Sequence, residues 1–139
     1  MITDYMRLIE LFAPAFFASK TDDQKEAIKR LAWFSYEFGL MKENGKLKIF
    51  GAGIMSSKGE LEKVVNGEIK VSEFTIDNVV RNPKAVFDYN KELFVFNSFE
   101  ELVEMLEEFF QTFPDFEKWR NTNLEGMINA VEDKEMVFD

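Results

Sequence analysis

One carboxylate, Glu37, lies in the largely apolar stretch LAWFSYEFGL at residues 31–40. On a helix, its neighbours three and four positions away are all apolar: Trp33, Phe34, Leu40 and Met41. Burying an unpaired carboxylate among such side chains costs several kcal/mol, so Glu37 must reach solvent, pair with a cation or bind a metal ion. From the local pattern alone the simplest interpretation is a polar stripe, because Arg30 lies two turns earlier on nearly the same face.

Two glycines, Gly51 and Gly53, follow a strand-like pattern in KIFGAGIMSS at residues 48–57. A strand, Gly-x-Gly, a short helix and a later acidic residue, Glu73, imitate the fingerprint of a dinucleotide-binding site. However, Ser56 occupies the third small position, the helix is short, and no further β-α-β units follow. We therefore favour a tight turn that needs glycine for a positive φ or for close backbone approach.

The segment EELVEMLEEFF at residues 100–110 carries five Glu residues, which could provide carboxylate chemistry. They fall mainly opposite a stripe of Phe and Leu, which is typical of an ordinary solvated helix face. Further along, Phe113, Phe116 and Trp119 indicate packing or a partner surface rather than a cofactor site.

The sequence contains no Cys and no His in its 139 residues. This excludes disulfides, thiolate nucleophiles and Ser-His-Asp triads within this chain. It also excludes metal sites built on Cys or His of this chain. Catalysis would have to rest on carboxylates, Lys, Ser, Tyr or the residues of a partner.

The elements expected to position these residues are mostly helices. Helices are predicted over residues 3–17 (interrupted or kinked by Pro14), 21–39, 57–67, 75–83 and 98–113, with a weaker helix after Pro114. Short strands are predicted at 46–50, 69–74 and 92–96, a hairpin-like turn at Asn44-Gly45 and a tight loop at 51–57. The expected fold class is α+β, predominantly helical with a few short strands.

The amino-acid composition indicates a single folded domain and argues against some classes of binding partner. The chain has the length of one domain, and 46% hydrophobic and 15% aromatic residues can fill a core. A formal net charge of -9 argues against nucleic acid and anionic membranes, which need clustered Lys and Arg. No apolar run reaches the length of a membrane span, and the N-terminus lacks the features of a signal peptide. We expect a soluble, cytoplasmic protein.

The stretch RLAWFSYEFGLMKENGKLKIFGAGIMSSKGELE, residues 30–62, resembles the pterin-dependent aromatic amino acid hydroxylases, most of all the bacterial phenylalanine 4-hydroxylases. The family has an aromatic-Trp-Phe/Tyr-Thr-Val-Glu-Phe-Gly-Leu helix end and, after a turn and a strand, Tyr-Gly-Ala-Gly-Leu-Leu-Ser-Ser-x-Gly-Glu-Leu. The spacing between the two blocks matches without a gap. Looser matches at residues 87–102 and 2–9 extend the resemblance to roughly residues 2–110.

This resemblance implies two parts of the chain. Residues 1–113 resemble the C-terminal portion of the hydroxylase catalytic domain, and residues 114–139 form a C-terminal helix and tail of unknown role. By position, Glu37 matches the carboxylate of a facial triad on non-haem Fe(II), where the metal would compensate its buried charge. The reaction implied is insertion of one oxygen atom into an aromatic ring, phenylalanine foremost, with tetrahydrobiopterin as electron donor.

The resemblance also implies a substrate pocket. Its substrate-binding positions are Trp33, Phe38, Gly53, Ser56, Ser57 and Glu60. The two aromatic residues match the pocket lining, and the glycine and serines match the loop beside the substrate's amino acid backbone. One of those serines supports an iron ligand in the family. Glu60 matches a further polar residue of the pocket.

The sequence also departs from the family pattern. The family takes its other two iron ligands from a His-x4-His pair upstream of this stretch, and this chain contains no His. The family's pterin-binding loop and the Arg that holds the substrate carboxylate also lie upstream. Ala32 replaces an aromatic residue near iron and cofactor, Tyr36 a small β-branched one, and Lys91 a proline. We expect that this chain alone neither binds iron or tetrahydrobiopterin tightly nor hydroxylates phenylalanine.

Three interpretations follow from the resemblance. The leading one is a fragment of a longer, truncated hydroxylase. The alternative is a non-catalytic stand-alone module that binds an aromatic amino acid or a partner protein. The third is a split enzyme, completed by self-association or by a complementing chain that carries the two histidines.

Overall fold

The computed structural model describes residues 2–82 and 90–134 of the 139-residue chain. Its helices are α1 (Ile2–Ala18), α2 (Asp22–Ala32), α3 (Ala52–Ser56), α4 (Lys58–Val65), α5 (Ile76–Val80), α6 (Phe99–Phe110), α7 (Phe116–Arg120) and α8 (Leu124–Lys134), together with a π-helical turn, η1 (Trp33–Glu37). Its strands are β1 (Leu40–Glu43), β2 (Lys46–Ile49), β3 (Lys70–Glu73) and β4 (Glu92–Phe96). The predicted α+β class, mainly helical with a few short strands, is confirmed.

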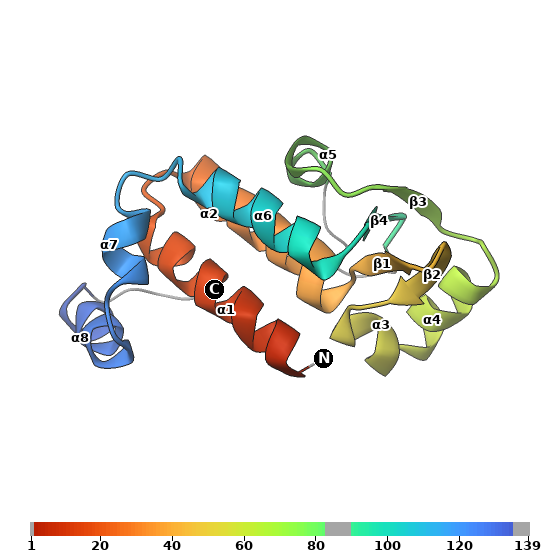
Figure 1. Cartoon of the computed structure of the whole chain (residues 1–139), viewed down its shortest axis with the longest axis horizontal. Coiled ribbons are helices and arrows are strands. Elements are labelled where there is room, and N and C mark those ends of the chain that lie inside the picture. The colour runs from red at the N-terminus through yellow and green to blue at the C-terminus, as the bar shows by residue number, and fades with distance from the viewer. Residues whose placement is uncertain (1, 83–89, 135–139) are drawn as a thin grey trace.

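The strands form one sheet in the order β2-β1-β4-β3. β1 and β2 are antiparallel neighbours, whereas β4 runs parallel to both β1 and β3. Asn44 and Gly45 connect β1 to β2 with positive φ angles of 55° and 75°, which confirms the predicted hairpin turn. Figure 1 shows the sheet at one end of the molecule, next to α3 and α4.

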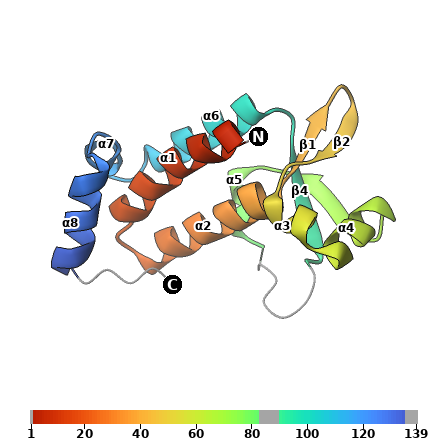
Figure 2. The same ribbon diagram turned by 90° about the horizontal axis from the view of Figure 1, so that it is seen from below.

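The long part of the molecule is helical. α1, α2 and α6 run alongside one another, and α7 and α8 lie at the end opposite the sheet (Figure 1, Figure 2). α2 begins at a capping box, in which Thr21 Oγ1 accepts from the Gln24 amide at 3.1 Å and Gln24 accepts from the Thr21 amide. The predicted N-cap at Thr21 is thus confirmed. No helix among residues 2–82 and 90–134 is both long and apolar enough to cross a membrane.

Pro14 lies inside α1 and does not interrupt it, contrary to one of the two predicted outcomes. A proline removes one backbone donor and crowds the carbonyl four residues earlier, which normally breaks a helix. Here Leu11, Ala15 and Ala18 on either side of Pro14 are buried in the core. Packing on both sides of the proline therefore holds the two halves in one helix.

Aromatic side chains make up much of the core. Several Phe side chains are almost completely buried: Phe34, Phe50, Phe74, Phe94, Phe96, Phe110 and Phe116. Many of them meet edge to face, such as Phe34 and Phe94 with ring centroids 4.9 Å apart. This packing joins η1 to β4, and it fixes the end of α2 against the sheet.

Two predicted elements differ in the structure. Residues 51–57 are not a tight loop, because the short helix α3 occupies Ala52–Ser56. The weaker helix expected after Pro114 is two helices, α7 and α8, which are separated at residues 121–123. The remaining predicted strands and helices are confirmed within a few residues. The predicted stop at Pro83 lies outside the described residues.

Candidate functional site

The aromatic rings of Trp33 and Phe38 lie side by side where α2 ends, with centroids 4.6 Å apart and planes inclined by 41°. The π-helical turn η1 brings them together, because its last hydrogen bond runs from the Phe38 amide to the Trp33 carbonyl at 2.8 Å. The two residues predicted to line an aromatic pocket are therefore in direct contact. Both remain partly exposed.

Gly51 and Gly53 pack directly beneath η1. A Cβ added at Gly53 would lie 2.7 Å from the Glu37 carbonyl oxygen and 2.8 Å from Phe38 Cζ. A Cβ at Gly51 would overlap the same carbonyl, and the φ of Gly51 is an ordinary -71°. Close backbone approach therefore accounts for the Gly-x-Gly spacing. The glycines lie against the Glu37 carbonyl and the Phe38 ring, and the dinucleotide interpretation loses its main argument.

The two predicted serines have local structural roles. Ser57 caps α4, since its Oγ accepts from the Glu60 amide at 3.3 Å. Ser56 is exposed, and its Oγ donates to the Gly53 carbonyl at 3.3 Å. Their predicted contact with a substrate stays a prediction.

Glu60 belongs to a buried chain of hydrogen bonds that ends on Trp33. Glu60 is 3% exposed. Its Oε1 accepts one hydrogen bond from the backbone N–H of Asn90 at 2.8 Å and a second from the side-chain Nδ2 of Asn90 at 3.2 Å. Asn90 Oδ1 in turn accepts from Trp33 Nε1 at 2.9 Å. Of the described buried side-chain polar atoms, Glu60 Oε2 is the one without a hydrogen-bond partner. We call Glu60, Asn90 and Trp33 the polar cluster.

Sequence reasoning missed Asn90. The residue lies within the looser family match at 87–102, just before β4, but only the neighbouring Lys91 was noted there as a departure. Lys91 is exposed, whereas Asn90 is buried. A polar residue with a short side chain directly before a buried strand can indicate a buried polar contact, although the sequence does not show which residues it contacts. Residues 87–89 of that match lie outside the described part.

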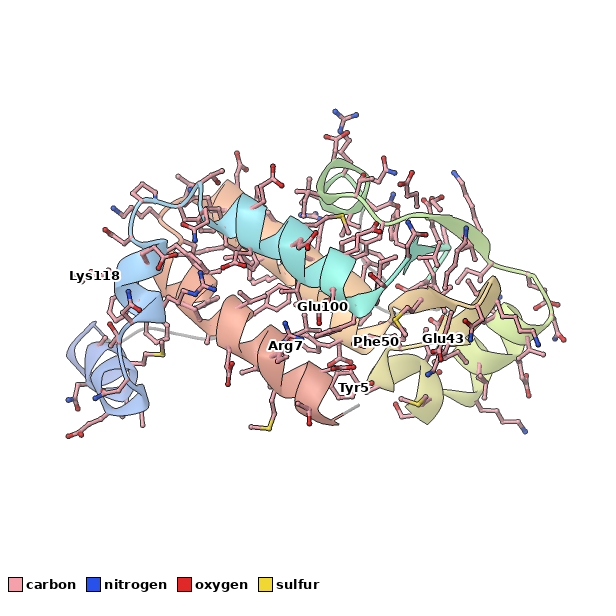
Figure 3. The ribbon with its side chains drawn as sticks, viewed as in Figure 1. Tyr5, Arg7, Glu43, Phe50, Glu100 and Lys118 are labelled. Carbon is pink, nitrogen blue, oxygen red and sulfur yellow. The ribbon has the colours of Figure 1, made fainter. Side chains whose placement is uncertain are left out.

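Glu37 is half-buried at the end of η1, and its closest titratable neighbours include two tyrosines. Burial, followed by the negative charge of Glu37, raises the pKa of Tyr5 and of Tyr36. The Tyr5 hydroxyl also donates to the Phe50 carbonyl, which ties α1 to the residue before Gly51 (Figure 3). The N-terminal turn of α1 therefore lies close to Glu37.

No ion pair joins Arg30 to Glu37 among the described residues. Arg30 instead donates from Nε to the Asn82 carbonyl at 2.9 Å and pairs with Glu26 at 3.4 Å. The wider turn of η1 separates the two residues, because seven positions no longer return to one face when part of the helix is π-helical.

The residues of this chain do not by themselves fit a complete iron site. Within residues 2–82 and 90–134, no group of three or more His, Cys, Asp or Glu side chains could hold a metal ion. The whole sequence also has no His, the nitrogen ligand of a 2-His-1-carboxylate triad. Glu37 could supply one oxygen ligand, and the two His ligands of such a triad would have to come from outside this sequence.

The acidic helix α6 is an ordinary solvated face, as predicted. Glu100 pairs with Arg7 at 2.7 Å, and the two side chains meet between α1 and α6 (Figure 3). The apolar residues Leu102, Leu106 and Phe110 of the same helix are buried. Beyond it, Phe113 and Phe116 are also buried, which confirms their packing role.

Comparisons with known proteins agree with the resemblance. The family model for biopterin-dependent aromatic amino acid hydroxylase matches residues 15–137. The tryptophan 5-hydroxylase of Xenopus laevis is 43% identical over 91 residues, which cover 63% of this chain and 19% of that protein.

Solved structures of phenylalanine hydroxylases share the fold. The apo enzyme of Colwellia psychrerythraea 34H has a TM-score of 0.65 and 22% identity, over 95% of this chain and 45% of that one. The iron- and phenylalanine-bound enzyme of Chromobacterium violaceum has a TM-score of 0.55 and 28% identity, over 68% of this chain and 34% of that one.

This chain is thus similar to part of each relative, since it spans 19% of the tryptophan hydroxylase and 45% or less of the two solved enzymes. The family match at residues 15–137 includes both Trp33 to Phe38 and Gly51 to Glu60, the segments that form the site. It also extends across α7 and into α8, past the predicted division after residue 113, which itself stays a prediction. The chain belongs to the family of biopterin-dependent aromatic amino acid hydroxylases.

Proposed function

We propose that this chain forms the substrate-ring pocket of a phenylalanine hydroxylase and contributes one iron ligand, Glu37. The observation that carries the proposal is the Trp33–Phe38 ring pair, which is backed by Gly53 and joined to Glu60 through Asn90. Flat aromatic faces at this spacing provide a surface on which a phenyl ring can pack. The substrate is chosen from the phenylalanine bound to the Chromobacterium violaceum enzyme.

Glu37 supports the second half of the proposal. It is partly buried, it lies one residue before Phe38, and its carbonyl rests on the two glycines. A carboxylate placed there is next to the ring that would be hydroxylated. Burial is the main factor that raises the pKa of Tyr5, and the charge of Glu37 adds to it; we propose that a metal ion held partly by Glu37 would remove this second contribution.

The absence of His from this sequence limits which part of the reaction the chain can perform. The family is biopterin-dependent, and the related Chromobacterium violaceum structure holds iron. This sequence supplies no His, so it cannot provide nitrogen ligands of its own. We therefore propose that it binds and orients the aromatic amino acid, and that hydroxylation requires a second segment or chain that carries the missing ligands.

Phenylalanine titration of the purified chain tests the pocket. A ligand that binds only the folded state raises Tm, and at 100 times Kd the stabilisation is about 2.7 kcal/mol. We expect phenylalanine to raise Tm, and Trp33→Ala or Phe38→Ala to abolish the rise. Trp119→Phe is the matched control, because Trp119 lies in α7 and contacts Phe17. If the wild-type chain is folded and its Tm does not change with phenylalanine, tyrosine or tryptophan at millimolar concentration, the proposal is overturned.

Fe(II) titration tests the metal half separately. We expect little retention of Fe(II) by the chain alone, and no tyrosine formed from phenylalanine with tetrahydrobiopterin and oxygen. The chain should gain both properties when it is mixed with a histidine-bearing upstream segment from a related hydroxylase, and Glu37→Gln should lose them. Equal metal binding by the wild type and Glu37→Gln in that mixture would remove Glu37 as a ligand.

A further inference from the structure

The polar cluster joins three elements that are far apart in the sequence. Trp33 lies in η1, Glu60 lies in α4, and Asn90 precedes β4, so the hydrogen bonds span 57 and 30 positions. Asn90 is 5% exposed and Glu60 is 3% exposed. Buried side-chain contacts over such distances fix how the elements are oriented relative to one another, which apolar contacts do less strictly.

The chemistry of the side chains determines which group donates and which accepts in each hydrogen bond of the polar cluster. An asparagine side chain has one acceptor end and one donor end, whereas a carboxylate only accepts. Because Glu60 Oε1 takes the Asn90 Nδ2 donor, Asn90 must turn its Oδ1 toward the indole N–H of Trp33. The Asn90 backbone amide also donates to Glu60, so the bridging residue is held at two points.

This arrangement is a poor choice for stability alone. A buried carboxylate carries a desolvation penalty, and replacing buried ionic groups by well-packed apolar groups often leaves a protein equally stable or more so. Glu60 Oε2 has no hydrogen-bond partner among the described residues, so only one of the two carboxylate oxygens, Oε1, is seen to accept hydrogen bonds. The bonds made by Oε1 are those that orient Trp33.

We propose that Asn90 and Glu60 are positioning residues that hold the Trp33 indole against Phe38 and so set the shape of the aromatic pocket. Neither acts on the reacting atoms. Asn90 supplies the acceptor for the indole, and Glu60 fixes which way the Asn90 amide faces. The part of this inference that concerns substrate rests on the proposed function, whereas the orientation of Trp33 does not.

The indole N–H signal of Trp33 tests the orientation directly. In the protein labelled with 15N-tryptophan, Trp33 and Trp119 give the two indole signals of this sequence. We expect Asn90→Ala and the similarly sized Asn90→Leu, which both lack the acceptor oxygen, to shift the Trp33 signal and to speed its hydrogen exchange at least tenfold. The Trp119 signal is the internal control. An unchanged Trp33 signal in a folded Asn90 variant overturns the proposal.

Glu60 offers a conservative rescue. Glu60→Gln retains a carbonyl oxygen that can accept from Asn90, so the Trp33 signal should stay like that of the wild type. Glu60→Ala removes the acceptor and should reproduce the Asn90→Ala spectrum. If Glu60→Gln and Glu60→Ala give the same spectrum, then Glu60 does not act by accepting these hydrogen bonds, and its assignment as a positioning residue fails.

Phenylalanine binding then connects orientation to the pocket. We expect a Kd at least tenfold weaker in Asn90→Ala and Glu60→Ala, and a clearly smaller loss of affinity in Glu60→Gln than in Glu60→Ala. If wild-type chain binds no phenylalanine, the proposed function fails while the indole spectra still decide the orientation of Trp33. If the spectra change and the Kd does not, the cluster orients Trp33 without shaping the pocket, and that part of the inference is overturned.

Discussion

The two ends of this molecule are stabilised in different ways. At the helical end Phe110 packs against the rings of Phe12, Phe109, Phe113 and Phe116, with centroids 5.4 to 5.9 Å apart. At the sheet end the Phe34–Phe94 ring pair joins η1 to β4, and the side chains of Glu60 and Asn90 add a polar connection that also reaches α4. Ring packing is shared among many atoms, whereas the polar cluster depends on a few atoms in one arrangement.

The difference teaches where this chain can tolerate change. A substitution among the rings should lower stability in proportion to the volume removed, while the pocket keeps its shape until the protein unfolds. A substitution at the sheet end should alter the pocket at a smaller loss of stability. The variants below separate these two effects, from the largest expected change in free energy to the smallest.

Removal of the central ring at the helical end should have the largest effect. We expect Phe110→Ala to lower the free energy of unfolding by about 3–5 kcal/mol, because Phe110 is completely buried and leaves a cavity. Urea denaturation measures the loss. Phe110→Leu, which keeps most of the volume, should cost clearly less. A loss below 1 kcal/mol in Phe110→Ala would show that the ring cluster does not dominate this end.

A methyl group at Gly51 should disturb the sheet end by overpacking. Its Cβ would overlap the Glu37 carbonyl and lie 2.6 Å from the Gly39 nitrogen, and these are backbone atoms that cannot swing away. We expect Gly51→Ala to cost about 1–3 kcal/mol and to shift the Trp33 indole signal. Ala52→Ser, at an exposed neighbouring position, is the control and should leave both unchanged. A neutral Gly51→Ala would contradict the close packing under η1.

Glu92 should make the sheet end sensitive to acid. Hydrogen bonding from Ser72 is the main factor that lowers the pKa of Glu92, and Lys70 and Asn82 add to it. A lowered pKa in the folded state means that Glu92 stabilises the fold above its unfolded pKa, and that this stability is lost as the pH falls through the folded value.

The corresponding variant is Glu92→Gln. We expect it to lose about 1 kcal/mol at neutral pH, because Gln keeps an acceptor oxygen but loses the charge, and to unfold with a flatter dependence on pH below 5. Urea midpoints between pH 3 and 7 measure this. Glu43→Gln on the exposed hairpin is the control, since Glu43 pairs with Lys48 across the β1–β2 turn, away from Glu92. Parallel pH profiles of wild type and Glu92→Gln would refute the assignment.

The smallest expected change in stability concerns Glu37. Its charge helps to raise the pKa of Tyr5 and Tyr36, so Glu37→Gln should lower both. Ultraviolet titration of tyrosinate measures the shift. Because the folded pKa values are raised, the tyrosines contribute stability that is lost as the pH rises above their ordinary value of 10.0, and Glu37→Gln should reduce that loss. An unchanged titration would separate Glu37 from these hydroxyls.

Much of the fold could be predicted from local patterns, for physical reasons. The Thr21 cap, the Asn44-Gly45 turn and the apolar face of α6 each depend on residues close together in the sequence. The same local rules allowed Pro14 to interrupt α1, and that outcome is wrong, because buried neighbours outweigh the loss of one hydrogen bond. Local sequence patterns predict helices and turns well, but they do not predict when tertiary packing outweighs a local preference.

The site was only partly predictable. Trp33, Phe38 and Gly53 were named from a family resemblance, and the structure places them in contact. Asn90 was missed because its partners lie 30 and 57 positions away, and no periodic pattern reports such a separation. The shared face expected for Arg30 and Glu37 assumed an ideal α-helix, whereas residues 33–37 form a π-helical turn.

The π-helical turn has an evolutionary consequence. The positions of Trp33, Glu37 and Phe38 depend on how many residues the turn contains, and not only on which residues they are. Deleting one residue from it would return the segment to α-helical winding and rotate everything beyond by about 100° around the helix axis. Homologous sequences should therefore exchange exposed side chains in this segment freely while conserving its length, and insertions should collect in the β1–β2 hairpin instead.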